Sequence, residues 1–172
     1  MRRAGLIFAV MAVALVVGSG AALAATIRCE GGVCEGTKDP DTLTGSAVRD
    51  ITYGLGADDK LYGNGGDDEM YGNGSKDLLR GGHGADVMYG GPDNDNFYGE
   101  AGADYFYGGS GRDRMTGGPG RDHLYGSLDD DTIASQDGVF DVVDCGSGAY
   151  DAVVIDRGLD SVTNCENVYW QE

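Results

Sequence analysis

The stretch Gly81-Gly82-His83-Gly84-Ala85-Asp86-Val87-Met88-Tyr89 decides the fold, because its nine-residue pattern recurs eleven times without a gap over residues 36–134. Glycine opens every unit: Gly36, Gly45, Gly54, Gly63, Gly72, Gly81, Gly90, Gly99, Gly108, Gly117 and Gly126. Aspartate is the sixth residue of every unit: Asp41, Asp50, Asp59, Asp68, Asp77, Asp86, Asp95, Asp104, Asp113, Asp122 and Asp131. The eighth residue is apolar in ten of the eleven units, with Thr52 the exception. Residues fixed over consecutive units of constant length predict a repeat architecture.

Each unit divides into a turn of about six residues and a strand of about three. Glycine at positions one, two and four lets the backbone take positive φ, and Asn64 and Asn73 at position two are the next most tolerant residues. In the strand, position eight points inward while positions seven and nine point outward. Two units then form one coil with a strand on each side. The sequence predicts an all-β fold, a right-handed parallel β-roll (a β-helix solenoid) of five to six coils.

Stacking of the coils places the sixth-position aspartates in two columns, with a spacing of roughly 4.8 Å. Carboxylates at that spacing repel one another, and a hard dication between them removes the repulsion. Calcium accepts six to eight oxygen ligands at roughly 2.3–2.6 Å in loose geometry, whereas magnesium demands a tight octahedron. Thiolate and imidazole are absent from the periodic positions, which argues against zinc and copper. The gaps within the two columns set an upper limit of about nine Ca²⁺ ions, and the departures from the pattern in units one, two and eleven favour fewer.

The turn glycines are expected to complete each calcium site with backbone carbonyl oxygens, because no side chain obstructs them. The glycines expected in this role are Gly63, Gly65, Gly81, Gly82, Gly84, Gly90, Gly99, Gly102, Gly108, Gly109, Gly111, Gly117, Gly118 and Gly120. One apolar side chain for every nine ordered residues is a thin core, since backbone ordering alone costs roughly 1–2 kcal/mol per residue. We therefore expect residues 36–134 to fold only when calcium binds.

Two units, residues 81–89 and 117–125, spell G-G-x-G-x-D-x-U-x, where U is apolar. On these residues the chain resembles the RTX, or hemolysin-type, calcium-binding nonapeptide repeat family, and the resemblance covers residues 36–134. Family members often carry such repeats beside a toxin, protease or lipase domain and are exported without an N-terminal signal. This chain is expected to differ in both respects, with an N-terminal signal and no room for a catalytic domain. It is therefore expected to be a stand-alone secreted member and not an enzyme.

Residues 1–24 have the pattern of a cleaved secretory signal peptide: Arg2 and Arg3, an apolar run over residues 6–17, and a small-x-small site at residues 22–24. A membrane anchor is the alternative, but the apolar run is shorter than the roughly 20 residues that a span needs. The mature protein is expected to be secreted, extracellular and monomeric, without a membrane span. The chain carries a net charge of −17, which excludes nucleic acid as a natural partner.

Four cysteines suit an exported protein. The favoured pairing is Cys29 with Cys34 and Cys145 with Cys165, the second pair being about one coil apart. A zinc site is the rival, but the spacing is not C-x-x-C and both histidines fall inside repeats. Residues 25–35 are expected to form an N-terminal cap with a disulfide loop, and residues 135–172 a disulfide-stapled C-terminal β cap, because solenoids need atypical terminal units.

Tyrosine occupies position nine in every second unit and forms a column on one outer face: Tyr53, Tyr71, Tyr89, Tyr107 and Tyr125. Stacked tyrosines stabilise neighbouring strands, whereas the alternative is a ligand face on which sugar rings stack. The favoured function is therefore extracellular calcium binding with calcium-triggered folding. A calcium-dependent adhesion or cell-surface glycan-binding module is the alternative, and a component of a hemolysin-like toxin or secreted hydrolase is the least favoured.

Overall fold

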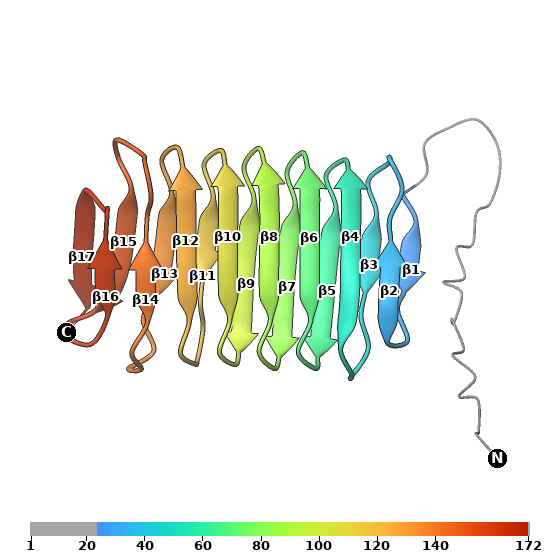
Figure 1. Ribbon diagram of the computed structural model, residues 1–172, viewed down its shortest axis with the longest axis horizontal. Helices are drawn as coiled ribbons and strands as arrows, with labels where there is room; N and C mark the ends of the chain where they lie inside the picture. The colour runs from blue at the N-terminus through green and yellow to red at the C-terminus, as the bar shows by residue number, and fades with distance from the viewer. Residues whose placement is uncertain (1–23, 172) are drawn as a thin grey trace, which may run out of the picture.

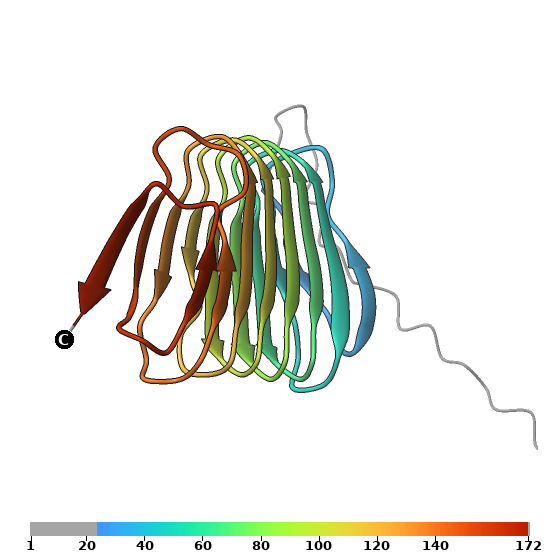
Figure 2. The same ribbon diagram turned by 60° about the vertical axis from the view of Figure 1, so that its left-hand side comes forward.

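The computed structural model describes residues 24–171, so the predicted signal peptide lies outside the described residues except for Ala24. All regular structure in this range is β-strand, in seventeen strands. Residues 24–171 contain no helix that is long and apolar enough to cross a membrane. The strands lie side by side along one axis and form two sheets that face each other (Figures 1 and 2).

The odd-numbered strands form a nine-stranded parallel sheet, here called sheet A. In spatial order its strands are β1 (Thr26–Arg28), β3 (Thr42–Thr44), β5 (Lys60–Gly65), β7 (Leu78–His83), β9 (Asn96–Ala101), β11 (Arg114–Thr116), β13 (Thr132–Ser135), β15 (Ala152–Asp156) and β17 (Asn167–Gln171). The chain crosses to the other sheet after every strand, so neighbours within sheet A are one full coil apart in sequence.

The even-numbered strands form the eight-stranded parallel sheet B. Its strands are β2 (Gly32–Glu35), β4 (Asp50–Gly56), β6 (Glu69–Gly74), β8 (Val87–Pro92), β10 (Tyr105–Ser110), β12 (His123–Leu128), β14 (Val142–Asp144) and β16 (Ser161–Thr163). Parallel strands joined by crossovers between two facing sheets confirm the predicted β-solenoid.

The solenoid is longer than the repeats alone predict, and the expectation of five to six coils is wrong. The eleven units supply strands β3 to β13, but β1 and β2 precede them and β14 to β17 follow, giving about eight turns. The terminal strands keep the same register, with Ile27 beside Leu43 and Val143 beside Val162. The segments predicted as caps therefore extend both sheets, because a coil requires strand pairing and an inward apolar residue but not the full glycine pattern.

Most strands in the repeat region have six residues rather than the three predicted. Strand β5, for example, begins at position seven of one unit and continues through position three of the next, where Asn64 pairs with Gly82 and Gly65 with His83. Identical turns in successive coils keep these backbones aligned, so the ladder continues beyond the glycine at position one. The turn between strands is correspondingly shorter than predicted.

The core is a double row of the predicted eighth-position side chains, each 0–1% exposed: Leu43, Thr52, Leu61, Met70, Leu79, Met88, Phe97, Phe106, Met115, Leu124 and Ile133. Phe97 and Phe106 come from opposite sheets, with ring centroids 5.6 Å apart. Both predicted disulfides are present, with Cα–Cα distances of 5.9 Å for Cys29–Cys34 and 5.2 Å for Cys145–Cys165. They lie near the two ends of the solenoid. The zinc alternative is wrong, because the four cysteines that it needed as ligands form these disulfides.

Candidate metal sites

All eleven sixth-position aspartates are buried at the start of their strands, with no more than 2% of their surface exposed. They form the two predicted columns, and a hydrogen-bond ladder joins the members of each column. In units three to eleven, Oδ1 accepts a hydrogen bond from the backbone N–H of the aspartate one coil earlier, at 2.7–2.9 Å. One carboxylate oxygen of each aspartate therefore holds adjacent coils together.

The second oxygen, Oδ2, is different, because nine of these atoms are buried without any protein donor. They belong to the aspartates of units three to eleven: Asp59, Asp68, Asp77, Asp86, Asp95, Asp104, Asp113, Asp122 and Asp131. A buried charged oxygen without a partner costs roughly several kcal/mol. Native proteins therefore seldom contain one, and a row of them is rarer still. Within the described residues, these nine atoms are the strongest indication of cation binding.

The two N-terminal units meet the same need with protein atoms. Position two is a hydroxyl residue there, and its side chain donates to Oδ2 at 2.9 Å, from Thr37 to Asp41 and from Ser46 to Asp50. The backbone N–H of the same residue also donates to that oxygen. Asp41 and Asp50 were predicted as metal ligands together with the other aspartates. In the structure, both oxygens of each of these two carboxylates accept hydrogen bonds from protein donors.

The C-terminal coils repeat this solution. The Oδ2 atom of Asp141 accepts from the Ser135 hydroxyl, and that of Asp151 accepts from the Gly148 N–H at 3.2 Å. The Oδ1 ladder continues into these coils, since Asp122 N–H donates to Asp141 at 2.8 Å and Asp131 N–H to Asp151 at 2.7 Å. The ladder thus runs through every coil, whereas the unpaired oxygens are confined to the middle of the solenoid.

Burial raises the pKa of each of the nine central aspartates well above its ordinary value of 3.8. Desolvation is the largest cause; the backbone N–H bond to Oδ1 lowers each pKa in part, and neighbouring carboxylates raise it. The pKa reaches about 6 for Asp59 and Asp86 and about 8 for Asp95. It is about 7 for Asp68, Asp77, Asp104, Asp113, Asp122 and Asp131. Burial therefore disfavours the charged form of these carboxylates, a cost that a bound proton or a bound cation would remove.

Position-one glycines, which were predicted to need positive φ, do not adopt it. They are required for space instead. A Cβ on Gly99 would lie closer than 3.0 Å to Asp104 Oδ2 and to the Gly117 carbonyl oxygen of the next coil. The same two oxygens, from the unit's own aspartate and from the next coil, approach Gly63, Gly81, Gly90 and Gly108. Each of these five glycines thus lies where an unpaired carboxylate oxygen and a backbone carbonyl oxygen converge.

Positions two and four take positive φ in every unit from four to eleven, whichever residue stands there. A Cβ at position two or four would strike the carbonyl oxygen of the same position one coil earlier, as Gly82 meets Asn64 and Gly102 meets Gly84. These carbonyls therefore project between successive turns. The predicted set included only glycines and missed Asn64, Asn73, Asp93 and Glu100, whose carbonyls project in the same way. It also named Gly65, whereas the left-handed residue of that turn is Gly66.

The donor set of one aspartate oxygen and several backbone carbonyls is made of hard oxygen ligands, which suits calcium. Within residues 24–171, no three histidine, cysteine, aspartate or glutamate side chains are grouped closely enough to hold a metal by themselves. Backbone carbonyls must therefore contribute most of the ligands, as the glycine-rich turns permit. The residues present fit a calcium ion between successive turns of the central coils.

The tyrosine column lies on the outer face of sheet B, away from the turns. Neighbouring rings in the series Tyr53, Tyr71, Tyr89, Tyr107 and Tyr125 are 4.8–5.1 Å apart and within 11° of parallel. Each inner ring is covered on both faces by its neighbours, which supports its role in holding strands together. A ligand face on this column stays a prediction.

Comparison with known families gives one match. The model of the RTX calcium-binding nonapeptide repeat, which spans four copies, matches residues 44–79, 53–88, 71–106, 80–115 and 107–139. Among curated proteins, none matches the chain. The family matches overlap or adjoin one another over more than half of the chain and include all nine aspartates that have an unpaired oxygen. The chain therefore belongs to the RTX calcium-binding nonapeptide repeat family.

Proposed function

We propose that this calcium-binding repeat protein acts outside the cell and that its central coils fold when Ca²⁺ ions bind between successive turns. The observation that carries the proposal is the row of nine buried Oδ2 atoms without a protein donor, which is confined to units three to eleven. Calcium supplies the positive charge that these atoms lack, and it accepts carboxylate and carbonyl oxygens as ligands. One ion for each such carboxylate gives an upper limit of nine ions.

The residues of the chain prepare each site. The backbone N–H bonded to Oδ1 fixes the orientation of the carboxylate, and the position-one glycine leaves room for Oδ2. Left-handed residues at positions two and four direct carbonyl oxygens into the gap between turns. Without a cation, the aligned carboxylates are desolvated and repel one another along each column. The end coils lack this difficulty, so we propose that they require no ion.

An extracellular setting is supported by the two disulfides, which form and persist in oxidising compartments. The proposed signal peptide at residues 1–24 agrees with this location. Extracellular calcium modules bind in the range of roughly 10⁻⁴–10⁻³ M, so the chain would stay unfolded in the cytoplasm and fold after export. We propose a binding role and no catalytic one, because the acidic residues of the core form a hydrogen-bond ladder that calcium would cover.

The test is a far-UV circular dichroism titration of residues 25–172 with calcium, starting from metal-stripped protein. We expect a cooperative change from coil to β-sheet near millimolar calcium. Magnesium at the same concentration is the control and should produce little folding, since it dehydrates reluctantly and demands a tight octahedron. Full β-sheet content before calcium is added at neutral pH would contradict the proposal.

Acid should partly replace calcium. A carboxyl group whose pKa is higher in the folded than in the unfolded chain binds its proton more tightly when folded. Its contribution favours folding at low pH and is lost as the pH rises through the folded-state pKa. Because the nine central values lie between about 6 and about 8, metal-stripped protein should gain β-sheet content between about pH 8 and pH 5.

Circular dichroism of metal-stripped protein at a series of pH values measures this effect. Acid also reduces the net negative charge of the surface, so the control is about 0.5 M sodium chloride at pH 8, which screens exposed charges but hardly affects buried ones. If salt induced folding equally well, the effect of acid would come from the exposed surface charges rather than from the buried aspartates.

A further inference from the structure

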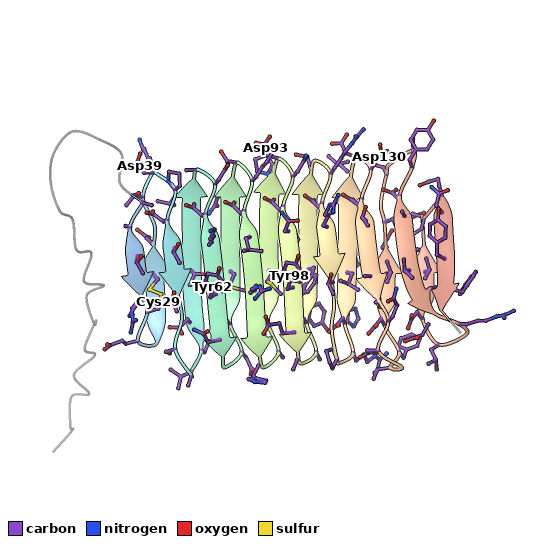
Figure 3. All side chains as sticks on the ribbon, turned by 180° about the vertical axis from the view of Figure 1, so that it is seen from behind. Cys29, Asp39, Tyr62, Asp93, Tyr98 and Asp130 are labelled. Carbon is purple, nitrogen blue, oxygen red and sulfur yellow. A yellow bond between two sulfur atoms is a disulfide. The ribbon has the colours of Figure 1, made fainter. Side chains whose placement is uncertain are left out.

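The outer face of sheet A carries a recess of about 340 Å³ whose lining includes Tyr62, Arg80 and Glu100. On this face Tyr62, Arg80 and Tyr98 follow one another in register on β5, β7 and β9. Figure 3 shows Tyr62 and Tyr98 at mid-height on the same face, away from the turn residues Asp39, Asp93 and Asp130. On sheet A, Arg80 therefore interrupts the series by separating Tyr62 from Tyr98, whereas the tyrosine column on sheet B is continuous.

The interruption opens the recess, because Arg80 is drawn toward one neighbour. Its guanidinium carbon lies 5.0 Å from the ring centroid of Tyr98, and its Nη1 atom lies 3.7 Å from the Glu100 carboxylate. Tyr98 and Glu100 both belong to β9, so the side chain leans away from β5. In the described residues Tyr62 stacks on no other aromatic ring and contacts no cation, unlike the inner rings of sheet B.

Gly82 deepens the same opening. It stands in register between Asn64 on β5 and Glu100 on β9, where any other residue would place a side chain. The result is a recess one coil wide, with Tyr62 and Asn64 on one wall, Arg80 and Glu100 on the other, and His83 beside them. The recess thus places one aromatic ring beside four polar side chains, which can form hydrogen bonds with a small polar ligand.

We propose that this recess binds a single ring of a neutral saccharide. The face of Tyr62 suits the apolar C–H face of a sugar ring. Arg80 offers only donors and Glu100 only acceptors, a combination that matches adjacent hydroxyl groups, each of which donates and accepts. The Asn64 amide nitrogen donates to the Gly45 carbonyl oxygen at 2.8 Å, which leaves its Oδ1 atom as a further acceptor. Arg80 and Glu100 neutralise each other and the whole chain carries a net charge of −17, so an anionic ligand is disfavoured.

The site differs from the tyrosine column on sheet B, where stacking within the column covers the ring faces. The saccharide would contact side chains on the sheet surface, whereas the backbone carbonyls of Asn64 and Glu100 project between turns. The site therefore deepens the glycan-binding alternative and requires that the coils be folded. Because folding is proposed to need calcium, binding is expected only under conditions in which circular dichroism shows β-sheet structure.

The experiment is saturation-transfer difference NMR followed by calorimetric titration of the calcium-loaded protein with the methyl glycosides of glucose, galactose, mannose and N-acetylglucosamine. We expect at least one to bind with a dissociation constant of about 1 mM, typical of a single small ring at a shallow site. Tyr62→Ala should weaken this binding by about tenfold, because the stacking face is lost, whereas Tyr62→Phe should retain most of it.

A second variant tests the recess independently, in case Tyr62→Ala disturbs the fold. Glu100→Gly removes the carboxylate acceptor at a position where φ is 70° and where most units already carry glycine or asparagine, so the fold should be preserved. It should also weaken binding about tenfold, while Tyr89→Ala on sheet B should not. The proposal is overturned if none of the four glycosides binds the folded protein, or if binding is unchanged in Tyr62→Ala and Glu100→Gly. Circular dichroism in calcium separates a loss of folding, which concerns the calcium proposal, from a loss of saccharide binding.

Discussion

Replacement of Gly99 by alanine should destabilise the calcium-loaded protein by about 3 kcal/mol or more, the upper range for overpacking of a buried site. The new Cβ would lie closer than 3.0 Å to Asp104 Oδ2 and to the Gly117 carbonyl oxygen. Neither atom is free to move, since the first is buried in the carboxylate column and the second belongs to the backbone of the next coil. Relief would require displacement of the oxygens that are proposed to bind calcium.

Gly74→Ala is the matched control, at position three of its unit. Its φ is not positive, and a Cβ there would lie 3.6 Å from its nearest neighbour, the Leu55 carbonyl oxygen. This substitution should stabilise the protein by about 0.5 kcal/mol, because alanine restricts the unfolded chain. Urea unfolding in saturating calcium measures both changes. Equal effects of the two substitutions would show that position one has no special packing requirement.

Asp95→Asn should have opposite effects in the two conditions: it should stabilise the fold without calcium and weaken it in calcium. The asparagine oxygen can still accept the Asp77 N–H bond, which is 2.8 Å long, while the buried charge disappears. Burial raises the pKa of Asp95 to about 8, so loss of the charge should stabilise the calcium-free fold above neutral pH. In calcium the same substitution removes a charged ligand, and the affinity of the affected site should fall by at least about tenfold.

Asp50→Asn provides the contrast within the same kind of ladder. Its Oδ2 accepts the Ser46 backbone N–H at 2.7 Å, and an amide NH₂ in that place would present a donor to a donor. In saturating calcium this variant should lose about 1–3 kcal/mol of its free energy of unfolding. Calcium-dependent urea unfolding of both variants measures the difference. If Asp50→Asn instead lowered calcium affinity as Asp95→Asn does, the assignment of a metal-free N-terminal end would be wrong.

The nonapeptide period was sufficient to predict the parallel solenoid, the inward eighth position and the two aspartate columns, since all three follow from one repeat of fixed length. The cysteine spacing was sufficient for both disulfides. The number of coils was not predictable from the glycine pattern, because the C-terminal coils keep only the ladder. Spacings of 19 and 20 residues replace 18 between Asp122 and Asp141 and between Asp131 and Asp151, and longer turns absorb the additional residues.

The site was predicted in outline but not in atomic roles. Sequence reasoning placed calcium between neighbouring aspartates of a column without separating the roles of the two carboxylate oxygens, whereas the ladder commits Oδ1 to a backbone N–H, a bond that becomes visible only once the coils are stacked. It also attributed every glycine to φ, although position one needs space and Glu100 adopts positive φ without being glycine. A signal for the proposed metal-free end was present in the hydroxyl residues Thr37 and Ser46 at position two, but their meaning depends on their bonds to Asp41 and Asp50.

The most direct test of the account is a crystal structure of the mature chain grown in calcium, with an anomalous difference map to locate the ions. The account predicts ions between successive turns, each in contact with an Oδ2 atom of the series Asp59, Asp68, Asp77, Asp86, Asp95, Asp104, Asp113, Asp122 and Asp131, and none at Asp41 or Asp50. Ions at Asp41 and Asp50 equal to those in the centre, or no ions beside the central aspartates of a folded chain, would contradict it.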